Sequence, residues 1–179
     1  MDTVKIEIDY TKLKDIAEKY TDWQQTMISA RYPEGNLQDG VGGLHNYDYG
    51  TNNQDWNKLH SHWIGTYIEE LYYKIIEVLP EMGRLRFMTM DGRSCYSIHK
   101  DFDGPRLHIP VLGSREEGFF VINDVVHRLD YDKCYLVDVR QPHTYVWTGD
   151  YPRVHIVGNL GDFEWTEEFG YTSQGLVEV

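Results

Sequence analysis

The spacing of apolar residues changes along the chain, from mixed periods in the first half to short strand-like segments afterwards. Apolar and charged residues alternate over 4–8, which predicts a half-exposed strand. Apolar residues three and four positions apart predict amphipathic helices near 11–20 and over 66–79. Thr66 and Glu69 match a capping box at the start of the second helix, which ends before a proline.

From position 85 onwards, short apolar segments are separated by glycine, aspartate and proline. Asp91-Gly92 follows the first segment, 85–90, with the chemistry of a two-residue hairpin turn. Further strands are expected at 94–101, 105–112, 118–123, 134–139, 144–148 and 152–158, with an earlier one at 27–32. Many short strands divided by turns are typical of a closed or double-sheet β architecture. Several are apolar on both faces, so one face would line the barrel and the other would pack beneath the N-terminal helices.

The 179 residues contain no internal repeat, low-complexity tract or linker, which predicts one domain. Within it we expect a helical and loop support at 1–84, a β core at 85–160 and a C-terminal extension at 161–179. Residues 33–57 are rich in glycine, asparagine, aspartate and tyrosine and have no period. A loop of this length is often a functional lid, and a plain surface excursion is the alternative.

Composition narrows the classes of partner. The formal net charge is −12, whereas nucleic-acid binding draws on clustered lysine and arginine, so we expect no nucleic-acid partner. Cys95 and Cys134 make no disulfide framework and no CxxC motif, which fits a reducing compartment. The N-terminus matches neither a signal peptide nor a membrane span. We therefore expect a cytoplasmic protein that acts on a small molecule or a peptide, in an oligomeric state left open.

Candidate chemistry gathers between 98 and 157. His99 and Asp101 are two residues apart, so on a strand their side chains leave the same face. If folding brings in His143, two imidazoles and one carboxylate make the facial triad of non-heme Fe(II) sites. Arg153 follows ten residues later, after a turn, and is expected on a neighbouring antiparallel strand with its side chain pointing the same way. Its guanidinium could hold a carboxylate through two parallel hydrogen bonds.

This ordered set of residues resembles that of the Fe(II)/2-oxoglutarate-dependent oxygenases. The run Arg106-Leu107-His108-Ile109-Pro110 and the later Val126-His127-Arg128-Leu129 resemble the aspartyl/asparaginyl β-hydroxylase branch, which includes small bacterial proline hydroxylases. The resemblance covers roughly Leu85 to Leu160. It implies a double-stranded β-helix, that is, a jelly-roll or cupin-like fold.

The resemblance also implies a reaction and a set of roles. Fe(II) would be held by His99, Asp101 and His143, while 2-oxoglutarate would be bound by Arg153 at its distal carboxylate and by His108 near the metal. Arg106 would hold a carboxylate of the substrate. With O2 as the oxidant, an amino acid or an Asp-, Asn- or Pro-like peptidyl side chain would be hydroxylated, and succinate and CO2 released.

Two aromatic residues are expected beside the substrate. Tyr47 lies in the loop 33–57, and Trp147 lies in the strand expected at 144–148. Tyrosine combines an apolar body with a polar tip, so some of the 14 tyrosines can line a pocket.

Two alternatives and one departure from the family accompany this hypothesis. Animal β-hydroxylases of the branch have no carboxylate at the position of Asp101 and sit behind a membrane anchor, so a free amino acid is at least as good a candidate substrate as a peptidyl one. A metal-free or sugar-binding jelly roll would have a broken triad, and this triad is intact. A cupin-type metalloenzyme that does not use 2-oxoglutarate would have mostly histidine ligands and would lack the arginine after the distal histidine.

Overall fold

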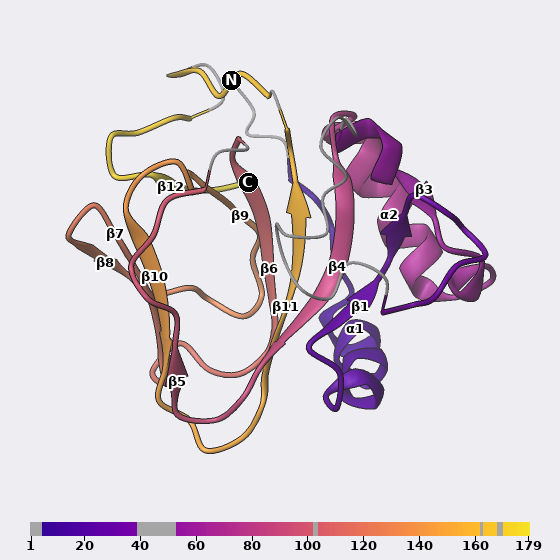
Figure 1. Ribbon diagram of the computed structural model, residues 1–179, viewed down its shortest axis with the longest axis horizontal. Coiled ribbons are helices and arrows are strands. Elements are labelled where there is room, and N and C mark those ends of the chain that lie inside the picture. Colours follow the sequence, from indigo (N-terminus) through magenta and orange to yellow (C-terminus); the bar gives the residue numbers. More distant parts are fainter. Residues whose placement is uncertain (1–4, 39–52, 102–103, 162, 168–169) are drawn as a thin grey trace.

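The computed structural model describes residues 5–38, 53–101, 104–161, 163–167 and 170–179. Two antiparallel β-sheets face each other, and the helices pack on the outer side of the larger sheet (Figure 1). This arrangement confirms the expected mainly β, double-sheet fold with N-terminal helices. No helix in the described ranges combines the length and the apolar character that crossing a membrane requires.

In the described part of the chain, the larger sheet has six strands and the smaller one four. In spatial order the larger sheet consists of β1 (Gln25–Met27), β4 (Gly83–Met90), β11 (Arg153–Asn159), β6 (Arg106–Leu112), β9 (Tyr135–Val137) and β12 (Leu176–Glu178). The smaller sheet consists of β5 (Ser94–Cys95), β10 (His143–Trp147), β7 (Gly118–Ile122) and β8 (Val125–His127). A separate pair is formed by β2 (Ser29–Ala30) and β3 (Lys58–Leu59). The strands β3, β8 and β12 were not expected from the sequence.

Both predicted helices are present. α1 (Tyr10–Ala17) continues into the 3-10 turn η1 (Glu18–Tyr20), and α2 is Tyr67–Val78. Two further 3-10 turns, η3 (Asn53–Trp56) and η4 (Ser61–Trp63), precede α2. The hydrogen bonds of Thr66 and Glu69 are each shifted by one residue from those of a capping box. The hydroxyl of Thr66 accepts from the Ile68 N–H at 3.2 Å, and Glu69 accepts from the Gly65 N–H at 2.7 Å.

Two strand predictions in the N-terminal region need correction. The described part of the predicted strand 4–8 has no strand pairing, because Ile6 packs into the helix-covered core while Asp9 caps α1 by accepting from the Lys12 N–H. The predicted strand 27–32 is divided between β1, which pairs with β4, and β2, which pairs with β3. Alternation in such short segments therefore reflected burial of single side chains and not one continuous ladder.

Two turns that looked like hairpins in the sequence carry the chain from one sheet to the other. Asp91-Gly92 joins β4 of the larger sheet to the smaller sheet, where β5 pairs with β10, so the hairpin prediction is wrong. The turn after β10 leads into β11 of the larger sheet in the same way. His143 and Arg153 therefore do not lie on neighbouring strands as expected, and face one cavity from opposite sheets.

The described hydrophobic core has two main clusters, besides a small one formed by Met27, Ala30 and Trp56. A large cluster lies between the helices and the outer face of the larger sheet, and it includes Leu85, Phe87, Leu107, Ile109, Val154, Ile156 and the buried faces of α1 and α2. A smaller cluster, which includes Phe120, Tyr145 and Trp147, fills part of the space between the sheets. The strands β4, β6 and β11 are thus covered on both faces. Between the sheets there is also a cavity lined by both polar and apolar side chains.

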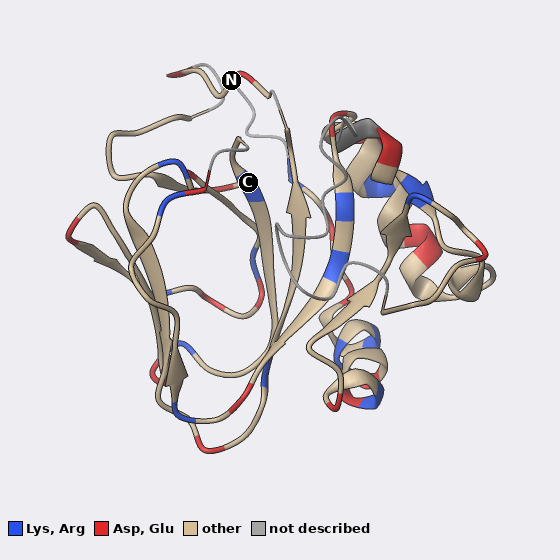
Figure 2. Cartoon of the chain, in the orientation of Figure 1, with Lys and Arg blue, Asp and Glu red and all other residues tan. Residues whose placement is uncertain are grey.

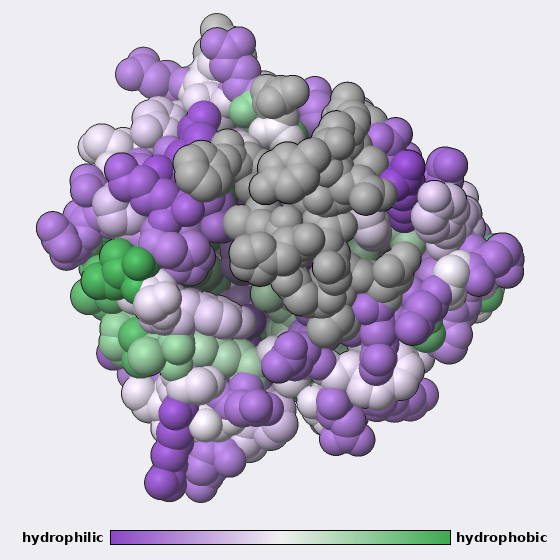
Figure 3. Space-filling view, viewed as in Figure 1, coloured by the Kyte–Doolittle hydropathy of each residue, from purple (hydrophilic) through white to green (hydrophobic). Residues whose placement is uncertain are grey.

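The surface fits the acidic composition. Most of the face seen in Figure 3 is hydrophilic, with apolar side chains gathered over the end of the smaller sheet. The exposed residues Val125 and Val126 of β8 lie in that sheet.

Candidate metal site in an arginine-rich cavity

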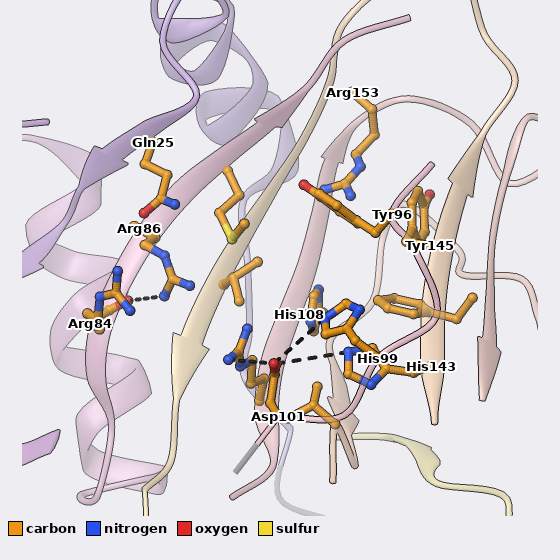
Figure 4. A pocket seen from close by; sticks show the side chains of 15 residues that line it. Gln25, Arg84, Arg86, Tyr96, His99, Asp101, His108, His143, Tyr145 and Arg153 are labelled. Carbon is orange, nitrogen blue, oxygen red and sulfur yellow. Dashed lines mark hydrogen bonds and ion pairs between the residues drawn. The ribbon is translucent and has the colours of Figure 1, made fainter. Parts of the chain in front are cut away.

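A cavity of about 270 Å³ lies between the two sheets (Figure 4). Its lining combines positively charged, imidazole and apolar side chains: Gln25, Arg84, Arg86, Met88, Tyr96, His99, Asp101, Arg106, His108, Phe120, Val139, His143, Tyr145, Arg153 and Val157. This volume is near the lower end of the range for ligand pockets, about 300–1,000 Å³, so the cavity suits small ligands.

The predicted triad is assembled at one side of this cavity. His99 and His143 form an isolated antiparallel bridge, with N–H to carbonyl distances of 3.1 and 2.9 Å, and their ring centroids are 4.4 Å apart. The Asp101 carboxylate lies 3.7 Å from Nε2 of His99 and 3.9 Å from Nε2 of His143. One ligand atom from each residue lies within 4.8 Å of the others, so the group can hold a metal ion.

The histidine tautomers suit metal binding. Nδ1 of His99 is 2.7 Å from the Ser97 carbonyl, and Nδ1 of His143 is 2.9 Å from the Gln141 carbonyl. A carbonyl only accepts hydrogen bonds, so both Nδ1 atoms carry the proton and both Nε2 lone pairs face Asp101. Burial lowers the pKa of His143, which further favours the neutral form that a metal ligand requires. The donor set therefore fits a divalent metal with two imidazoles and one carboxylate.

Arg106 extends from β6 to the triad. Its guanidinium lies 2.7 Å from Oδ2 of Asp101, so it orients the carboxylate. The role expected for Arg106, binding a carboxylate of the substrate, stays a prediction.

His108 and His155 are buried imidazoles on the two neighbouring strands β6 and β11. Their rings are 5.8 Å apart, and Nδ1 of each has no hydrogen-bond partner among the described residues. Burial, reinforced by the nearby positive charge of Arg153, holds the pKa of both well below the usual value. Both are therefore neutral at pH 7, and His108, which lines the cavity, can donate an N–H to a bound carboxylate.

These two pKa values predict a loss of stability in mild acid. Below about pH 6.5 the histidines take up protons in the unfolded chain and stay neutral in the folded one, so falling pH favours unfolding by up to about 1.4 kcal/mol per pH unit for each histidine. Urea unfolding of the metal-free protein is measured at pH 7.5, 6.5 and 5.5. The free energy of unfolding should decrease below pH 6.5, and this decrease should be smaller in His155→Phe than in the wild type. The same change at the exposed His62 is the control. An unchanged pH dependence in His155→Phe would contradict this assignment.

Arg153 is buried without an acidic partner. Its side chain comes from β11, the residue is 3% exposed, and it contacts Sδ of Met90 at 3.5 Å and the ring of Tyr145 at 4.3 Å. No carboxylate pairs with it among the described residues, and burial raises the pKa of Tyr145, so this phenol stays neutral. Burying an unpaired cation is costly, which indicates that the site is built for an anionic ligand.

The remaining predicted site residues either lie away from the cavity or fall outside the described residues. Trp147 does not line the cavity. It is 1% exposed in the core between the sheets, where its indole N–H donates to the Tyr151 carbonyl at 2.7 Å. Tyr47 and most of the predicted lid lie outside the described residues, so their roles stay predictions. Arg84 and Arg86 line the cavity but were not singled out in the sequence.

Comparison with known proteins gives similarity of fold alone. No protein-family model and no curated protein matches the chain. Among solved structures, it is similar to a "predicted oxalate decarboxylase" from Thermotoga maritima, with 16% identity and a TM-score of 0.39 over 49% of this chain and 73% of that one. A cupin superfamily protein from Desulfitobacterium hafniense has 16% identity and a TM-score of 0.37 over 44% and 67% of the two chains. A variant of salicylate 1,2-dioxygenase from Pseudoaminobacter salicylatoxidans has 17% identity and a TM-score of 0.35, and the match covers 42% of this chain and 21% of that one.

Proposed function

We propose that the protein is an Fe(II)- and 2-oxoglutarate-dependent dioxygenase that hydroxylates an amino acid or a peptidyl side chain. The observation that carries this proposal is the presence of Arg153, a buried guanidinium with no acidic partner among the described residues, in the same cavity as the triad. A dicarboxylate can engage both a metal at the triad and the guanidinium, whereas a monodentate metal ligand would leave the arginine unpaired.

In this proposal His99, Asp101 and His143 would hold Fe(II), a donor set that suits the non-heme Fe(II) chemistry of O2. When bound, Fe(II) supplies the chemistry by which O2 oxidises 2-oxoglutarate to succinate and CO2 and hydroxylates a C–H bond. The backbone carbonyls that accept from Nδ1 keep the two imidazoles in place, and Arg106 does the same for Asp101.

The remaining polar groups position 2-oxoglutarate. Arg153 can hold the distal carboxylate through two charge-assisted hydrogen bonds, over the ring of Tyr145 that fixes its plane. Neutral His108 donates a hydrogen bond to a carboxylate oxygen without competing for the proton. Apolar lining from Phe120, Val139 and Val157 lowers the local dielectric constant, which strengthens these contacts.

The test is succinate release from 2-oxoglutarate by the Fe(II)-loaded protein in air with ascorbate, against a panel of amino acids and short peptides. We expect release that requires Fe(II) and is stimulated by a subset of the panel. Metal binding without any 2-oxoglutarate-dependent succinate would contradict the proposal and favour a metalloenzyme that does not use this co-substrate.

A further inference from the structure

Two arginines on β4 line the cavity outside the residues of the family motif. Arg84 and Arg86 are two positions apart on the strand, and they are 4% and 2% exposed. Figure 2 shows the basic positions along β4, and Figure 4 shows both side chains on the wall formed by this strand, apart from the triad. They come from a different strand than Arg106 and Arg153, so they form a separate part of the lining.

Arg84 occupies a strained position in a β-bulge. In the pairing of β4 with β11, Val157 lies opposite Arg86 and Asn159 opposite Gly83, so Arg84 and its neighbour together face one residue of β11. Arg84 has φ 53°, a left-handed conformation that glycine adopts readily and other residues only at a cost. Bulges occur beside active sites, where they redirect a side chain. A strained arginine where glycine would be relaxed points to a function of the side chain.

The two guanidinium groups are held in place before any ligand arrives. Arg86 donates to the Arg84 carbonyl at 2.7 Å and to Oδ1 of Asn159 at 3.2 Å. Arg84 lies over the ring of Trp56 at 5.8 Å. Beside them, Gln25 of β1 has a buried Oε1 without a hydrogen-bond partner among the described residues. Donors fixed in this way bind an anion with little further loss of conformational entropy.

We propose that Arg84 and Arg86 form a second anion subsite, which binds the carboxylate of the substrate. This inference rests on the proposed function for the identity of the reaction, and it names the substrate class as a free small-molecule carboxylate. A cavity of about 270 Å³ has the size for small ligands. The buried Oε1 of Gln25 can accept an N–H next to that carboxylate, as in an amino acid.

The test measures binding of matched acids and amides by calorimetry, with Mn(II) in place of Fe(II) and with 2-oxoglutarate present. The probes are the 20 common L-amino acids, the linear mono- and dicarboxylic acids of up to six carbons, and the corresponding amides. We expect at least one free acid to bind, and its amide to bind at least about tenfold more weakly, as for loss of a charge-assisted contact. If no acid binds, or if acid and amide bind equally well, the subsite proposal is overturned.

Three variants separate the subsite from general damage to the fold. Arg86→Gln and Arg84→Gly should each weaken binding of the acid at least about tenfold. Arg84→Gly should stay folded at the assay temperature, because glycine relaxes the positive φ although the contact with Trp56 is lost. The matched control is Arg93→Gly, since Arg93 also has φ 53° but is exposed and does not line the cavity, and it should bind the acid as the wild type does.

Titration of 2-oxoglutarate distinguishes failure of this inference from failure of the proposed function. If Arg84→Gly and Arg86→Gln bind the acid as tightly as the wild type, the subsite is wrong, whatever 2-oxoglutarate does. If the wild type does not bind 2-oxoglutarate but its binding of the acid depends on Arg84 and Arg86, the subsite stands and the proposed reaction falls.

Discussion

Replacing Asp101 with alanine is expected to weaken Fe(II) binding at least about a hundredfold and to abolish coupled turnover. Loss of a residue that merely supports a ligand costs about 10- to 100-fold in metal affinity, and Asp101 would itself be a ligand. It is the single carboxylate among the described residues that line the cavity. Its removal would also break the contact between Oδ2 and the Arg106 guanidinium at 2.7 Å.

The control for this change is Asp138→Ala. Asp138 is also a buried carboxylate paired with an arginine at 2.7 Å, Arg140, but it does not line the cavity. Both variants should lose stability because a buried carboxylate and its ion pair with an arginine are removed, and only Asp101→Ala should lose the metal. Equilibrium dialysis against Fe(II) under anaerobic conditions measures this difference. Wild-type affinity in Asp101→Ala would refute the triad.

The order of strands in the second half of the chain could be predicted from the sequence, but their assignment to sheets could not. The strands β6, β7, β10 and β11 begin and end close to the predicted positions, because glycine, proline and aspartate mark the turns between them. Short turns after β4 and β10 suggested hairpins. A strand that is apolar on both faces fits against several partners, so its pattern does not specify which sheet it joins.

The metal triad was accessible to sequence reasoning because its information is local. A spacing of two positions predicted that the side chains of His99 and Asp101 share one face, and both line the cavity, although the strand expected at 94–101 is limited to β5 and His99 forms only an isolated bridge. Arg84 and Arg86 carried no such motif. Both line the cavity together with Met88 of the same strand. The available signal in the sequence was that arginines alternate with apolar residues in a strand covered on both faces.

Trp147 was expected beside the substrate but does not line the cavity. An aromatic residue in the strand of a predicted ligand looks like a substrate contact, and the sequence does not reveal that its indole N–H has a backbone partner, the Tyr151 carbonyl. The residue packs against Tyr151 with ring centroids 5.3 Å apart and supports the smaller sheet. Tryptophan is usually placed by where its single N–H can be satisfied, which depends on the fold.

Replacing Arg153 with glutamine is expected to raise the Kd for 2-oxoglutarate about 10- to 100-fold while Fe(II) binding stays nearly intact. A charge-assisted contact in a water-excluded site contributes about 1.5–3 kcal/mol, which corresponds to that factor. Arg153→Lys should recover only part of the affinity, because an ammonium cannot form two parallel hydrogen bonds to one carboxylate. The measurement is an anaerobic titration of 2-oxoglutarate into the Fe(II)-loaded protein, following the weak visible charge-transfer band.

The matched control is Arg128→Gln. Arg128 also lies over an aromatic ring, that of Phe119 at 5.1 Å, but it is exposed and does not line the cavity. Arg128→Gln should leave the titration of 2-oxoglutarate unchanged. Arg86→Gln should do so as well, which would show that the subsite of Arg84 and Arg86 is distinct from that of Arg153. Loss of an unpaired buried cation should not lower the melting temperature of Arg153→Gln by much, since no ion pair is broken in the described structure. A wild type that shows no band, or an Arg153→Gln variant that binds 2-oxoglutarate as tightly as the wild type, would exclude the proposed role of this arginine.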